Sequence, residues 1–115
     1  MQALDLYSNG IDDEGAIAIA ATLPRTALIS LNMSDNQIGD EGAIALAQTL
    51  PRSRLMSLNV WRNVIGVVGA TAIAAALPDT LLTSLNLANN SIGDDGARAL
   101  ATAVERAPCL SDLDM

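Results

Sequence analysis

The chain has 115 residues and a formal net charge of −7, a length that suits one domain. The acidic balance argues against nucleic acids and anionic membranes as partners, because both need clustered Lys and Arg to neutralise phosphate. The sequence has no histidine and a single cysteine, Cys109. It therefore lacks the residues expected for nucleophilic catalysis or for the usual zinc sites, and we expect no enzyme, metal or cofactor.

A nine-residue segment of alternating apolar residues recurs four times, and each copy ends in an asparagine. The copies are MQALDLYSN (1–9), LISLNMSDN (28–36), LMSLNVWRN (55–63) and LTSLNLANN (82–90). Their two-residue alternation predicts a short strand with one buried face. The terminal asparagines Asn9, Asn36, Asn63 and Asn90 are spaced 27 residues apart. Because a carboxamide both donates and accepts hydrogen bonds, we expect them to form a ladder that binds loop backbone.

A helical pattern follows each asparagine. Ala43, Leu46, Ala47 and Leu50 fall at i, i+3, i+4 and i+7, which predicts one apolar stripe of a helix. Asp40 and Asp94 are predicted N-caps. One glycine recurs in each first turn, where we expect it to let helix and strand approach closely: Gly15, Gly42, Gly69 and Gly96. A proline is predicted to stop the first three helices: Pro24, Pro51 and Pro78.

The pattern L-x-x-L-x-L-x-x-N, followed by a sequence motif of the type G-A-x-A-L-A, resembles the ribonuclease-inhibitor-like class of leucine-rich repeats, including GALA-type repeats. The resemblance covers nearly the whole chain. It implies an α/β right-handed solenoid, or horseshoe, with a parallel sheet on the concave face and helices on the convex face. The expected single domain spans 1–115, with repeats at about 1–27, 28–54, 55–81 and 82–108 and a partial fifth repeat at 109–115, where the period slips by one residue.

The strand positions between the leucines are expected to face the concave surface, with equivalent residues aligned in columns. One column is Ala3, Ser30, Ser57, Ser84 and Asp112, and the next is Asp5, Asn32, Asn59, Asn86 and Asp114. A third column is Tyr7, Ser34, Trp61 and Ala88, followed by Ser8, Asp35, Arg62 and Asn89. The only two aromatic residues thus share a column, about 10 Å apart given a strand spacing of about 4.8 Å.

These columns predict a partner-binding surface. Trp, Tyr and Arg often dominate binding energy at protein interfaces, so Trp61 with Arg62 is the leading candidate and Tyr7 is a second anchor. Charge and polar contacts are expected from the remaining column residues Asp5, Asp35, Asn32, Asn59, Asn86, Asn89, Asp112 and Asp114. Two alternatives stay open: Trp61 covers neighbouring side chains without touching a partner, and the acids only solubilise the array and cap its helices.

The third repeat departs from its siblings at the start of its helix. Val67 and Val68 replace the acidic pairs found there in the other repeats, and Val64 is also specific to this repeat. We expect an uncapped helix start, at a cost of about 1 kcal/mol, and two apolar side chains in the loop. The change reflects either drift or a hydrophobic contact beside Trp61, so both valines are candidate binding residues.

The leading functional prediction is a protein–protein interaction module with a protein partner, a basic one being favoured by the charge. Because known members of the resembled class include GTPase activators and sensors, the alternatives are a fragment of a larger regulator (GTPase activator, ubiquitin-ligase adaptor or effector, or immune-type sensor) and an array without ligand. Polar capping repeats are not recognisable at either end. We therefore expect either a longer parent protein or a homo-oligomer formed through the uncapped ends. With one cysteine and no signal peptide or membrane segment recognised, the expected setting is cytoplasmic, or a host cell if the chain is a bacterial effector.

Overall fold

Five short strands alternate with four α-helices along residues 2–115, the part of the chain that this computed structural model describes. The strands are β1 (Ala3–Asp5), β2 (Ser30–Asn32), β3 (Ser57–Asn59), β4 (Ser84–Asn86) and β5 (Asp112–Asp114). The helices are α1 (Asp13–Thr22), α2 (Asp40–Thr49), α3 (Val67–Ala76) and α4 (Gly93–Val104). Short 3₁₀ turns follow the first three helices, at Leu23–Arg25, Leu50–Arg52 and Leu77–Asp79, each containing one of the predicted prolines. Met1, the first apolar position of the first repeat, lies outside the described residues.

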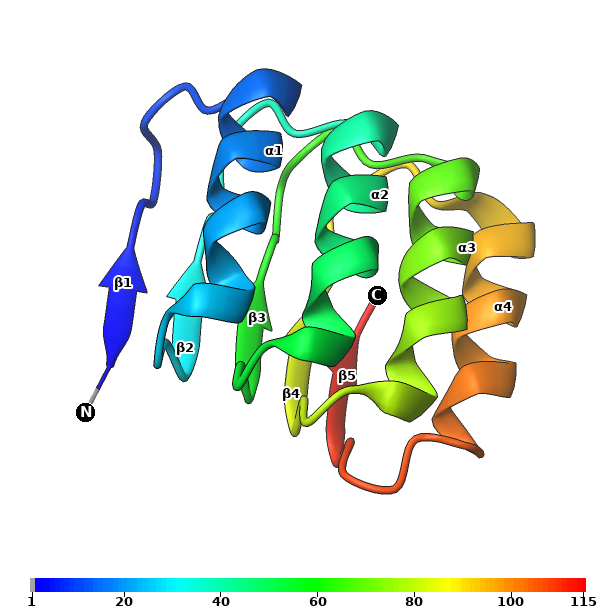
Figure 1. Cartoon of the computed structure of the whole chain (residues 1–115). Coiled ribbons are helices and arrows are strands. Elements are labelled where there is room, and N and C mark those ends of the chain that lie inside the picture. The colour runs from blue at the N-terminus through cyan, green and yellow to red at the C-terminus, as the bar shows by residue number, and fades with distance from the viewer. Residues whose placement is uncertain (1) are drawn as a thin grey trace.

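The strands form one parallel sheet in chain order, and the helices form a layer along one side of it (Figure 1). The sheet register aligns Leu31, Leu58 and Leu85 in one column, and each is 1% exposed. Between β4 and β5, Ser84 pairs with Asp112, which confirms the predicted slip of one residue. The fold is therefore the expected α/β solenoid with a parallel sheet and a helical layer.

The core lies between the sheet and the helical layer. The helix stripe read from the sequence faces it: Ala43, Leu46 and Leu50 are at most 1% exposed, and Ala47 is 9% exposed. Alanine is the common residue on this stripe, so the helices pack close to one another and to the sheet.

The recurring glycines serve a different contact from the one predicted. A Cβ added at Gly42 would lie 2.7 Å from Cγ2 of Ile38 and 2.9 Å from Cβ of Ala16, in the preceding helix. Gly69 has the same relation to Ala43, at 2.8 Å. The expectation of a close approach between helix and strand was therefore wrong: the missing side chain lets neighbouring helices come together.

Candidate functional site

The asparagines that end each strand segment bind backbone in the turns. The side-chain Nδ2 of Asn36 donates to the carbonyl oxygens of Leu6, at 3.1 Å, and Met33, at 3.0 Å. Its Oδ1 accepts from the N–H groups of Asn9 and Ile11, both at 2.9 Å. One side chain thus fastens its own turn and the turn of the preceding repeat.

Asn63 repeats this arrangement one repeat further on. It donates to the carbonyls of Met33 and Val60 and accepts from the N–H of Ile38, all at 3.0 Å. Asn63 is 6% exposed. Because a carboxamide this buried has little access to water, these bonds supply the hydrogen-bond partners that it needs. The turns that follow the strands are therefore held in a fixed stack.

Each of these turns contains a non-glycine residue with left-handed backbone. Ser8, Asp35, Arg62 and Asn89 have φ values of 56°, 56°, 56° and 58°, in a region that residues other than glycine seldom adopt. Hydrogen bonds between neighbouring turns hold this geometry: the N–H of Asp35 donates to the carbonyl of Trp61 at 2.8 Å, and that of Arg62 to Ala88 at 3.0 Å. The Arg62 Nε also lies 3.4 Å from Oδ1 of Asp35. The turn residues thus form a regular rim along the sheet.

The two aromatic residues differ in exposure. The strand register and the turn hydrogen bonds place Tyr7 and Trp61 at equivalent positions two repeats apart, with buried Ser34 between them in the column. Tyr7 is 54% exposed, whereas Trp61 is only partly exposed. Trp61 is thus partly covered by the protein itself.

The column of Asn32, Asn59 and Asn86 presents donors rather than acceptors. Each Oδ1 accepts from the N–H two residues later, at 3.0 Å. Asp5 does the same with the N–H of Tyr7 at 3.0 Å. Within residues 2–115, no hydrogen bond from the three Nδ2 groups is formed, so these groups remain able to donate to another molecule.

The helix starts overturn two of the capping predictions. Asp40 is the first residue of α2 and does not cap it; the N-cap is Gly39, which has no side chain. Asp94 lies inside α4, whose N-cap position is Ile92. The prediction that both acids cap their own helices was therefore wrong, because backbone hydrogen bonds extend each helix further toward the N-terminus. Only α1 is capped locally, by Asp12 accepting from Gly15 N–H at 3.2 Å.

The helices α2 and α3 are capped instead from the preceding repeat. Oδ1 of Asp13 accepts from the N–H groups of Gly39 and Gly42, at 2.7 and 3.0 Å. The sequence carries a signal for this: the residue before the helix is Asp12 in the first repeat but glycine in the second and third. A glycine cannot supply the side-chain acceptor, so the acceptor had to come from elsewhere.

The valines of the third repeat are also placed differently from the prediction. Val67 and Val68 are the first two residues of α3, not loop residues, and α3 is capped because Asp40 reaches its N–H groups. The side chains are nonetheless exposed, Val67 by 42%, Val68 by 59% and Val64 by 60%. Valine at 67 stands where its siblings have Asp13 and Asp40, so among α2, α3 and α4 of residues 2–115 it is α4 that lacks a cap from the preceding repeat.

A family model described as Leucine Rich repeat matches residues 1–20, 26–47 and 79–101. The chain belongs to the leucine-rich-repeat family. Among solved structures, this leucine-rich-repeat chain is similar to "Leiomodin-1 Actin-Binding Site 2 (ABS2)", with a TM-score of 0.91 and 22% identity over 99% of this chain and 69% of the other. That similarity shows the shared fold. No curated protein matches the sequence. Within residues 2–115, none of the helices has the length and apolar character needed to cross a membrane.

Proposed function

We propose that this leucine-rich-repeat chain is a protein-binding module that contacts its partner through the concave face of the sheet and the adjoining turns. The observation that carries the proposal is the shared column of Tyr7 and Trp61 on a face otherwise built from Ser, Asn and Asp. These are the two aromatic residues of the sequence, and Trp and Tyr are typical residues of interface hot spots. The partly covered Trp61 ring needs little further ordering on binding.

The polar groups of the same face suggest what the partner presents. The free Nδ2 groups of Asn32, Asn59 and Asn86 suit backbone or side-chain oxygen acceptors. The exposed carboxylates at the two edges of the sheet, Asp5, Asp112 and Asp114, suit basic side chains there. We therefore propose a partner with oxygen acceptors at the centre of its surface and basic residues at the margins.

The exposed valines extend this proposed surface at one side. Val64, Val67 and Val68 lie in the turn after β3 and the first turn of α3, close along the chain to Trp61 and Arg62. Exposed apolar side chains grouped in one place are typical of interaction sites. The third repeat is therefore the proposed centre of the interface.

We propose that the acidic residues cap helices or contact a partner, and that they do not catalyse a reaction. Oδ1 of Asp13 and Oδ1 of Asp40 each accept from two backbone N–H groups. Their arrangement is explained by helix capping. The exposed free thiol of Cys109 suits a reducing compartment, so the proposed setting is the cytoplasm.

The first partner to test is actin, because the similar leiomodin-1 structure is an actin-binding site. If actin does not bind, candidate partners are captured from a cell lysate. The chain has a single Trp, so partner binding over the concave face should shift its fluorescence to shorter wavelength. We expect Trp61→Ala and Tyr7→Ala each to weaken binding in calorimetry by about tenfold or more. Leu81→Ala, which truncates a 51% exposed side chain just before β4, is the control. Unchanged affinity in both aromatic variants would remove the proposal.

A second proposal concerns the edges of the sheet. Leu4 in β1 is 40% exposed and Leu113 in β5 is partly exposed, whereas Leu31, Leu58 and Leu85 of the same column are 1% exposed. Edge strands with apolar side chains favour pairing with another chain. We therefore propose that the 115-residue chain self-associates through these edges. Light scattering coupled to size exclusion should show more than one copy at tens of micromolar, reduced by Leu4→Lys; a monomer alone would contradict it.

A further inference from the structure

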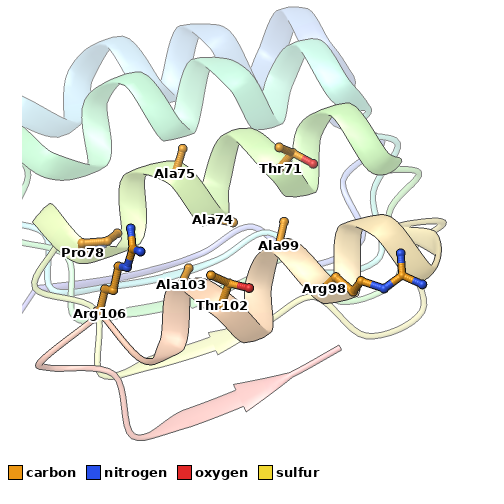
Figure 2. Close-up of a pocket in the computed structure, with 9 residues that line it drawn as sticks. All are labelled: Thr71, Ala74, Ala75, Pro78, Arg98, Ala99, Thr102, Ala103 and Arg106. Carbon is orange, nitrogen blue, oxygen red and sulfur yellow. The ribbon is translucent and has the colours of Figure 1, made fainter.

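A groove of about 400 Å³ runs between α3 and α4 on the helical side of the protein, away from the sheet. Its floor consists of small side chains, among them Ala74, Ala75, Ala99 and Ala103. Figure 2 shows Arg106 beside Pro78 at one end and Arg98 toward the other end. The groove is thus lined mainly by small apolar side chains and has an arginine at each end.

The sequence explains why this groove differs from the others of the helical layer. At one position of the helices, the residue is Ile17 in α1, Ile44 in α2, Thr71 in α3 and Arg98 in α4; Ile44 is partly buried and the other three are exposed. The grooves along α2 are lined by Ile44 and by the long side chain of Gln48. At the position equivalent to Gln48, the third repeat has Ala75. The groove between α3 and α4 has therefore lost the larger side chains and gained Arg98, whereas Arg106 stands at the register of Arg25 and Arg52 of the first two repeats.

The two arginines stand out because the whole chain carries a net charge of −7. Arg98 is paired with Asp95 at 2.8 Å, but both side chains are 76% exposed. The ion pair is therefore weak, and Arg98 can bind another carboxylate in place of Asp95. Arg106 has no ion pair within residues 2–115. Arg98 lies in α4 and Arg106 lies in the turn two residues beyond its end. They are eight residues apart in sequence, and eight residues span about 12 Å in a helix.

We propose that this groove binds an amphipathic α-helix of a partner protein, with apolar residues on the buried stripe and carboxylates at both ends of it. Glutamates seven positions apart lie on one helix face and are separated by about 10.5 Å along the axis. Such a helix reaches both guanidinium groups while its apolar stripe covers the alanine floor. This second surface lies on the opposite side of the protein from the concave face and goes beyond the function proposed above.

The lining favours a helix over an extended peptide. An extended segment has backbone N–H and C=O groups that need partners along its whole length. Of the lining residues, only Thr71, Thr102 and the two arginines have side chains that can form hydrogen bonds. A helix satisfies its own backbone groups. A second copy of this chain is disfavoured as the occupant because none of the helices α1 to α4 of residues 2–115 carries two carboxylates seven positions apart.

The test uses a labelled, capped, alanine-rich helical peptide with two glutamates seven positions apart and leucine between them, measured by fluorescence anisotropy with the whole 115-residue chain. An isomeric peptide with the glutamates five positions apart, and hence on different faces, keeps the same charge. The double variant Arg98→Glu/Arg106→Glu should bind the first peptide at least about tenfold more weakly. Arg25→Glu/Arg52→Glu, which reverses two exposed arginines after α1 and α2, should leave binding unchanged.

The apolar floor is tested separately. Ala75→Gln places the second repeat's side chain in the groove and should also weaken binding, whereas Ala21→Gln, at the same exposed position of α1, should not. Circular dichroism verifies that each variant folds. Absence of binding below about 1 mM, equal binding of the two peptides, or insensitivity to the arginine and Ala75 variants would each overturn the proposal. So would loss of binding in Trp61→Ala, or a dimer that Ala75→Gln dissociates, since these outcomes assign the peptide to the concave face or the groove to a second copy.

Discussion

Oδ1 of Asp40 lies 2.7 Å from the backbone nitrogen of Gly66, a residue 26 positions later in the chain. The same oxygen accepts from the N–H of Gly69 at 2.9 Å, so a side chain in the first turn of α2 caps α3. Asp13 has the same relation to α2. Each of these bonds crosses from one repeat to the next, so the bonds that cap a helix also hold neighbouring repeats together. Repeat arrays depend on such contacts between neighbours.

Removal of this carboxylate should therefore destabilise the array. Asp40→Ala leaves two N–H groups of α3 without their acceptor, and we expect the free energy of unfolding to fall by about 1–2 kcal/mol. Urea denaturation followed by circular dichroism measures the change. Glu41→Ala removes the adjacent exposed acid and should cost less than about 0.5 kcal/mol. Equal losses in the two variants would mean that general charge, not the cap, is responsible.

Restoring the missing cap should stabilise α4. Gly39 and Gly66, whose N–H groups bind an aspartate, have extended backbone, with φ values of −108° and −104°. Gly93, which lies beside Val67 instead, has left-handed backbone with φ +65°. Val67→Asp supplies an acceptor for the N–H of Gly93, whereas the N–H of Gly96 already donates to the carbonyl of Ile92 at 3.2 Å. We expect a gain of about 1 kcal/mol in urea denaturation and slower amide hydrogen exchange in the first turn of α4. Val68→Asp adds the same charge at the next position and should give neither effect.

Helix packing at the recurring glycines provides a third prediction. A Cβ at Gly42 would lie within 2.9 Å of three atoms, including Ala16 Cβ, whereas at Gly96 the nearest atom would be 3.1 Å away. Gly42→Ala should therefore destabilise the protein by about 1–3 kcal/mol. Gly96→Ala should be nearly neutral because the gain in helix propensity, up to about 1 kcal/mol, offsets a mild clash. Thermal unfolding of both variants measures the difference, and a more damaging Gly96→Ala would contradict this account.

The sequence predicted the fold because its period carries the register. The spacing of Asn36, Asn63 and Asn90 aligned the strand columns, and the i, i+3, i+4 pattern identified the buried helix stripe. The cap of α3 could not be predicted in this way. Asp40 belongs to α2 in the sequence, and its carboxylate reaches α3 only because the repeats stack. Side-chain exposure was likewise beyond the pattern: Trp61 occupies an outward position, yet neighbouring residues cover part of it.

The groove between α3 and α4 was missed for a related reason. Alanine at position 75 is unremarkable in an alanine-rich helix, and its effect appears only beside the alanines of α4. A comparison of Gln48 with Ala75, and of Ile44 with Arg98, at equivalent positions of the repeats was the signal that could have located it.

The buried asparagines should contribute more to stability than the exposed one. Asn63 is 6% exposed and bonds to backbone groups of both adjacent turns, including the carbonyl of Met33 and the N–H of Ile38. Asn63→Ala leaves several buried backbone groups without partners, each costing about 1–3 kcal/mol, so we expect a loss of about 3 kcal/mol or more in urea denaturation. Asn9 is exposed, and its side chain makes one bond, to the Tyr7 carbonyl at 3.2 Å. Asn9→Ala should therefore cost less than about 1 kcal/mol, since water replaces the lost partner. Comparable losses at the two positions would show that the asparagines act through the local turn alone and not through the stacking of neighbouring repeats.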